Sequence, residues 1–110
     1  MGAEQLTDIG YTAAVDILVV AFCRSYYARA RAIKTGKYKK RTLMEYEYMN
    51  SRISEAAREV AGDDFEKYIN EIGLSKGYAK SEVEYVSEYE YKNTKKEVKV
   101  NIAKKMHLID

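Results

Sequence analysis

The chain has 110 residues, enough for one domain (1–110) and too few for a second hydrophobic core. Hydrophobic residues make up 46%, charged residues 33%, and proline is absent, a composition that excludes a disordered tail, a collagen-like repeat and a proline-rich linker. One cysteine and one histidine exclude an internal disulfide, a four-cysteine zinc site and the common histidine-centred triads.

The net charge of +2 conceals an uneven distribution of charge along the chain. Residues 24–41 contain eight basic residues and no acidic one, whereas residues 63–91 sum to −5. A local patch of this kind attracts a partner of opposite sign whatever the total charge. We therefore expect a polyanionic partner at residues 24–41.

The first predicted helix begins at Thr7 or Asp8 and ends near Lys34. Its middle, residues 13–23, is apolar on nearly every side, which predicts burial against other helices or against a second copy in a homo-oligomer. This run is 11 residues long, whereas a bilayer-spanning helix needs about 20, so no contact with a membrane is expected. The first residues lack the positive start of a signal peptide, and the free thiol of Cys23 favours a cytoplasmic protein.

Two more helices are predicted in the middle of the chain, each with a capping-box pattern at its start and glycine at its end. The capping pairs are Thr42 with Glu45 and Asp63 with Glu66, and the glycines that end the first three helices are Gly36, Gly62 and Gly73.

The C-terminal segment fits two structures. Glutamate alternates with valine or tyrosine over residues 82–91, as in a half-buried strand, and residues 82–103 would then form a β-hairpin. Apolar residues from Tyr91 onward also recur at helical spacing, Ser81 with Glu84 makes another capping box, and glutamate and lysine favour helix. We prefer the helix, which predicts an all-α bundle of about four helices.

The basic stretch is the first candidate binding site. On a continuous helix its early residues share one face, and the face continues into a basic segment around Gly36. Arginine beside tyrosine suits phosphate pairing and base stacking. The alternative is a solvated helix end whose cations complement the helix dipole. The candidate residues are Arg24, Tyr27, Arg31, Lys34, Lys37, Lys39, Lys40 and Arg41.

A second candidate site lies in residues 68–83, which resemble the centre of a helix-turn-helix. In that resemblance Gly73 makes the turn, Ser75 caps the second helix, and Lys76, Tyr78 and Lys80 lie at its groove-facing start. Glutamates that follow in the same segment would repel phosphates. An ordinary helix end explains the pattern equally well.

The remaining chemistry-bearing residues predict structural roles. Most of the eleven tyrosines are expected at the core boundary, although some could line a ligand cavity or a subunit contact. Asp16, among apolar neighbours, needs a partner, which we expect to be an arginine of the second helix. Cys23 is expected in the core and His107 at a helix end. No enzyme signature, cofactor site or metal site is found, so we expect a protein that is not an enzyme.

Several short segments resemble small uncharacterised proteins of prophages and conjugative elements of Gram-positive bacteria. The resemblance is carried by Tyr46-Glu47-Tyr48-Met49-Asn50, Glu71-Ile72-Gly73, Gly77-Tyr78 and residues 102–108. It implies an accessory protein of a mobile element. We expect a DNA-binding regulator. The alternatives are an anti-defence protein (an anti-CRISPR type inhibitor that binds a host protein, or a protein that sequesters a nucleotide signal) and an oligomeric interaction module.

Overall fold

The computed structural model describes residues 6–110 and is all-α, as predicted. No strand occurs in this range, so the β-hairpin alternative for residues 82–103 is wrong. The α-helices are α1 (Ala13–Arg24), α2 (Tyr26–Thr35), α3 (Lys40–Ala61), α4 (Phe65–Gly73) and α5 (Glu88–Lys105), and the 3-10 turns are η1 (Leu6–Ile9), η2 (Gly62–Asp64) and η3 (Tyr78–Lys80).

The predicted first helix is interrupted at Ser25, which gives five α-helices in the described residues where about four were predicted. Helix α1 begins after Thr12, whose hydroxyl accepts a hydrogen bond from the backbone N–H of Val15 (3.3 Å). At the interruption, the carbonyl of Phe22 accepts a hydrogen bond from the guanidinium of Arg29 (2.5 Å). Because a side chain satisfies this backbone acceptor, the chain can change direction without an unpaired carbonyl.

The predicted glycine stops are correct, whereas the predicted capping boxes are not. Gly36 and Gly62 follow α2 and α3 with φ of 65° and 57°, values that favour glycine, and α4 ends at Gly73. Helix α3 begins at Lys40, two residues before Thr42, and no side chain caps it. Asp64 rather than Asp63 precedes α4, again without a side-chain cap.

The segment between α4 and α5 is mostly extended loop. The preferred helix is correct only from Glu88 onward, where the hydroxyl of Ser87 caps the backbone N–H of Glu90 (3.1 Å). The predicted start at Ser81 is wrong because the side chain of Glu71 in α4 holds that stretch. It accepts hydrogen bonds from the Ser81 hydroxyl (2.6 Å) and the Glu82 N–H (2.8 Å).

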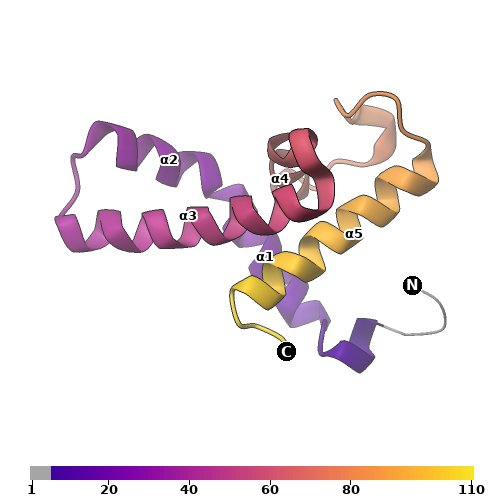
Figure 1. Ribbon diagram of the computed structural model, residues 1–110, viewed down its shortest axis with the longest axis horizontal. Helices are drawn as coiled ribbons and strands as arrows, with labels where there is room; N and C mark the ends of the chain where they lie inside the picture. Colours follow the sequence, from indigo (N-terminus) through magenta and orange to yellow (C-terminus); the bar gives the residue numbers. More distant parts are fainter. Residues whose placement is uncertain (1–5) are drawn as a thin grey trace.

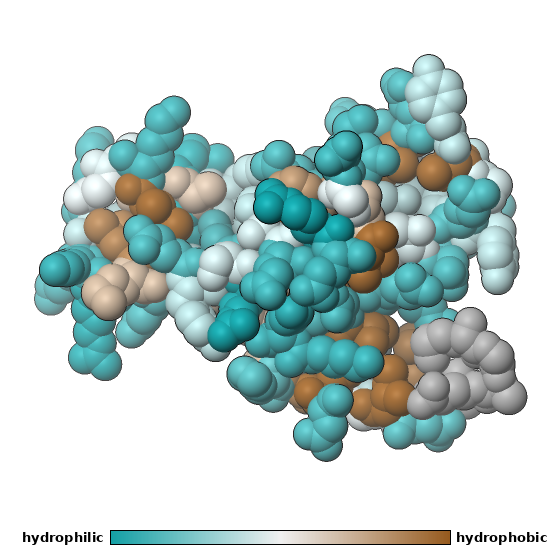
Figure 2. All heavy atoms as spheres, viewed as in Figure 1, coloured by the Kyte–Doolittle hydropathy of each residue, from teal (hydrophilic) through white to brown (hydrophobic). Residues whose placement is uncertain are grey.

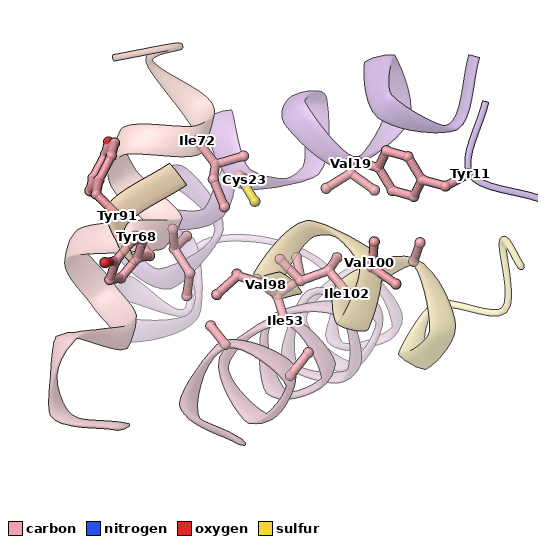
Figure 3. Packing of buried hydrophobic residues seen from close by; sticks show 14 of the residues in the cluster. Tyr11, Val19, Cys23, Ile53, Tyr68, Ile72, Tyr91, Val98, Val100 and Ile102 are labelled. Carbon is pink, nitrogen blue, oxygen red and sulfur yellow. The ribbon is translucent and has the colours of Figure 1, made fainter. Parts of the chain in front are cut away.

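The core is formed by α1, α4, α5 and the C-terminal part of α3 (Figure 3). Its fully buried side chains include Val19, Cys23, Ile53, Ile69, Ile72, Val98 and Ile102. The predicted core position of Cys23 is confirmed, and burial raises the pKa of its thiol to about 12. A thiol with so high a pKa is inert as a nucleophile at neutral pH.

Helix α2 and the N-terminal half of α3 project from this core as a pair (Figure 1). No residue between 27 and 52 belongs to the core or packs against it as a partly buried apolar residue. We call residues 27–50 the arm. The protein measures 46 × 31 × 20 Å, and the arm accounts for much of its elongation.

Asp16 has a partner, but not the predicted one. Its carboxylate accepts a hydrogen bond from the hydroxyl of Tyr11 (2.7 Å) and lies 3.1 Å from the ammonium of Lys99 in α5. An arginine of the second predicted helix does not pair with Asp16, because that helix, α3, packs against α2, α4 and α5 rather than against α1. The ion pair joins α1 to α5.

Candidate polyanion-binding arm

Buried polar contacts hold the two helices of the arm together. Arg29, only 7% exposed, donates from Nε to Oδ1 of Asn50 (2.7 Å), and Nδ2 of Asn50 donates to the carbonyl of Tyr26 (3.0 Å). Burial lowers the pKa of Arg29. At the far end, the rings of Tyr38 and Tyr46 meet edge to face with centroids 6.1 Å apart. The arm is therefore fixed by specific contacts although it has no share in the core.

The basic side chains at the end of the arm face solvent. The exposed set is Arg31, Lys34, Lys37, Lys39, Lys40 and Arg41. Within residues 6–110, only one of these six makes an ion pair, Arg41 with Glu45 (3.5 Å), and both partners are largely exposed. Such a pair contributes little free energy and leaves the arginine free to exchange Glu45 for another anion. The whole arm carries seven basic and two acidic residues, a net charge of +5.

Helix dipoles account for only part of this charge. Lys34 lies in the last turn of α2, where a cation is favourable. Lys39, Lys40 and Arg41 instead lie at the start of α3, where the dipole repels cations and the first turn contains no acid. The backbone N–H groups and these side chains therefore create positive potential at the same place. This arrangement favours a bound phosphate and disfavours a bare solvated helix end.

An apolar strip runs along α3 beside the basic end. Met44 is 59% exposed and Tyr48 is 49% exposed, and together with Lys40 and Arg41 they border a shallow groove. The guanidinium of Arg52 lies 5.1 Å from the centroid of the Tyr48 ring. Figure 2 shows hydrophobic residues on the surface of the arm among hydrophilic ones. An aromatic ring between cations is a surface on which bases or sugars stack.

Sequence analysis missed this strip. Met44, Tyr48 and Arg52 follow one another every four residues, so they share a helix face. The sequence does contain a sign of it, because Met44 and Tyr48 do not lie on the apolar face of α3 that contains the buried Ile53. Large apolar residues away from a buried stripe indicate a surface that contacts a partner.

Two predicted site residues, Arg24 and Tyr27, do not lie at the basic end of the arm and contact α4 instead. Arg24 donates from Nε to the carbonyl of Gly73 (3.2 Å), and Tyr27 donates to the carbonyl of Glu66 (3.2 Å). Both side chains attach the α1–α2 junction to α4. The predicted single face from Arg24 to Lys34 does not form because the helix is interrupted at Ser25.

The predicted helix-turn-helix does not form. Ser75 adopts φ of 56°, and the 3-10 turn Tyr78–Lys80 is the only helical structure in residues 74–87. Tyr78 donates to the carbonyl of Val86 (2.8 Å), and the carbonyl of Lys76 accepts from Tyr91 (3.4 Å). Lys80 is exposed on the turn. No recognition helix is present to place these residues in a DNA groove.

Comparisons with known proteins find no family model, no curated protein and no solved structure that matches the chain. Within residues 6–110, no helix combines the length and the apolar character that crossing a membrane requires. The function is therefore argued from the geometry of the arm.

Proposed function

We propose that the protein binds DNA through the arm, by contact with the phosphate backbone. The observation that carries the proposal is the group of six exposed cations at the end of the arm, three of which lie at the start of α3, where the first turn contains no acidic residue. Tyr48, stacked under Arg52, supplies an adjacent surface for a sugar or base. Because phosphate contacts contain no sequence information, this binding has low sequence specificity. Binding with low sequence specificity suits the proposed role, that of a mobile-element protein which contacts DNA without a recognition helix.

The salt dependence of DNA binding tests the proposal. With about six phosphate contacts, affinity falls by roughly three decades between about 50 and 200 mM salt. The triple variant K37Q/K39Q/K40Q is expected to bind more weakly at low salt and to lower the slope of log K against log salt by about 3. The measurement is fluorescence anisotropy of a labelled random-sequence duplex.

The matched control removes the same charge elsewhere. The variant K67Q/K80Q/K104Q replaces three exposed lysines outside the arm, so both triple variants have the same net charge. It is expected to retain the wild-type slope. Equal weakening by both variants, or no binding of the wild type at low salt, would contradict binding through the arm.

We also propose that two copies associate through α1. Ala14, Ile17, Leu18 and Ala21 form an apolar stripe along its solvent side. Ile17 is 69% exposed and Leu18 is 44% exposed, although the same helix contributes the buried Val19 and Cys23 to the core. The stripe reads nearly the same in both directions, so an antiparallel second copy places Ile17 against Leu18 and alanine against alanine. A two-fold interface requires this self-complementarity.

The oligomeric state tests the α1 contact. The variant I17Q/L18Q is expected to be a monomer at micromolar concentration where the wild type is a dimer, because the apolar area that drives association is lost. Analytical ultracentrifugation measures the mass. The control variant M44Q/Y48Q changes exposed apolar residues of the arm and is expected to leave the dimer intact. A monomeric wild type would refute the contact.

A further inference from the structure

Four lysines of α5 lie on one helix face and border a cleft distant from the arm in sequence. Lys92, Lys95, Lys96 and Lys99 follow at i, i+3, i+4 and i+7, the spacing of neighbours on one face. The cleft has a volume of about 240 Å³, and its other walls include Tyr11, Asp16, Gly77, Tyr78 and Tyr91. None of these residues belongs to the arm.

Two of the four lysines already have a carboxylate partner. Lys99 is paired with Oδ1 of Asp16, the same oxygen that accepts the hydrogen bond from Tyr11. Lys92 pairs with Glu88 one turn earlier (3.6 Å), on the exposed surface. Among residues 6–110, Asp16 is the only acidic residue that lines the cleft.

The other two lysines make no ion pair. None of the salt bridges within residues 6–110 includes Lys95 or Lys96. The ammonium of Lys95 donates to the carbonyl of Lys76 and lies 5.7 Å from the centroid of the Tyr91 ring. Burial and then the charge of Lys99 lower the pKa of Lys95, and the more distant charges of Glu71 and Asp16 offset this only in part. A bound anion would offset it further, because a nearby negative charge favours the charged form of the lysine.

One tyrosine, Tyr78, adds an aromatic wall. The rings of Tyr78 and Tyr91 lie 5.7 Å apart, but Tyr78 is 36% exposed whereas Tyr91 is 1% exposed. The hydroxyl of Tyr78 donates to the carbonyl of Val86, and that of Tyr91 donates to the carboxylate of Glu71 (2.8 Å). Tyr78 therefore offers a ligand its ring surface, in the same cleft as Lys95 and Lys96.

We propose that this cleft binds a small molecule that carries a phosphoryl group. A phosphoryl dianion matches two positive charges, and the lysine ammonium binds phosphate as a point charge. The Tyr78 ring contacts the sugar or ring attached to the phosphoryl group. The volume admits such a group but not a nucleic-acid duplex. The site is independent of the proposed DNA-binding arm.

Isothermal titration with inorganic pyrophosphate at constant ionic strength tests the site. The wild type is expected to bind one pyrophosphate per chain, in a saturable manner. The double variant K95Q/K96Q is expected to bind at least about tenfold more weakly, because two charge-assisted hydrogen bonds are lost. AMP is expected to compete with pyrophosphate, whereas adenosine is not. No saturable binding by the wild type, or competition by adenosine, would overturn the proposal.

Controls separate this site from the arm and from misfolding. K80Q/K104Q removes the same charge outside the cleft and is expected to bind within about twofold of the wild type. K96Q alone changes a side chain that makes no hydrogen bond or ion pair to any residue in the range 6–110, so weaker binding by this variant does not come from a broken contact of that range. The arm variant K37Q/K39Q/K40Q is expected to bind pyrophosphate normally. If this variant abolishes pyrophosphate binding instead, the cleft is not the site. If it weakens only DNA binding, the two sites are independent of each other.

Discussion

Replacing Glu71 with alanine is expected to lower the free energy of unfolding by about 3 kcal/mol or more. Glu71 is 1% exposed, and its carboxylate accepts three hydrogen bonds, from the hydroxyls of Ser81 and Tyr91 and from the backbone N–H of Glu82. Alanine leaves three buried or half-buried donors without an acceptor and opens a cavity between α4, α5 and the loop. Urea denaturation followed by circular dichroism measures the loss.

The pH dependence of stability gives a second readout of the same carboxylate. Burial alone would raise the pKa of Glu71, but the hydrogen bonds from Ser81, Glu82 and Tyr91 outweigh it and lower the pKa. Its contribution is therefore present above the pKa of the unfolded chain, about 4.3, and is lost as pH falls through the folded pKa. E71Q is expected to lose less stability than the wild type on acidification, since glutamine does not titrate.

A surface glutamate of the same helix provides the control. Glu66 is exposed, and its side chain makes no hydrogen bond to the part of the chain that the structure describes, so E66A is expected to change stability by no more than about 0.5 kcal/mol. If E71A and E66A are equally stable, the carboxylate of Glu71 does not hold the loop to α4.

Replacing Gly73 with alanine is expected to destabilise the fold by about 3 kcal/mol, because α4 meets α1 without space for a side chain. A Cβ atom at Gly73 would lie 2.7 Å from the backbone nitrogen of Arg24 and 2.9 Å from the carbonyl carbon of Cys23. These atoms belong to the backbone at the end of α1 and cannot rotate away. The helices would have to separate, which also weakens the bond from Arg24 to the carbonyl of Gly73. Thermal and urea unfolding of G73A measure the effect.

Gly77 is the matched control for Gly73. A Cβ atom at Gly77 meets nothing within 4 Å, and its φ of −95° suits any residue. G77A is expected to be neutral or slightly stabilising, since alanine reduces the freedom of the unfolded chain. Equal stability of G73A and G77A would show that α1 and α4 do not approach as closely as described.

Local patterns in the sequence determined the all-α class, the glycine stops at Gly36 and Gly62, and the concentration of cations in residues 24–41. These features depend on near neighbours only: helical periodicity extends over one or two turns, and a left-handed residue favours glycine wherever it occurs. The apolar run of residues 13–23 predicted burial against other helices or against a second copy, whereas Ile17 and Leu18 are exposed in the structure. Whether a second copy covers the stripe is the prediction made above.

Contacts distant in sequence decided the rest. The guanidinium of Arg29 accommodates the interruption at Ser25 and fastens α2 to α3 within the arm, and the carboxylate of Glu71 holds Ser81 and Glu82 in a loop where a helix was predicted. Both are buried polar groups whose partners lie 7 to 21 residues away. A local pattern does not reveal such partners. The pairing nevertheless overrides local helix propensity, because leaving a buried charge unpaired costs more free energy than that propensity supplies. Tertiary structure therefore placed the cations on a projecting arm and removed the recognition helix.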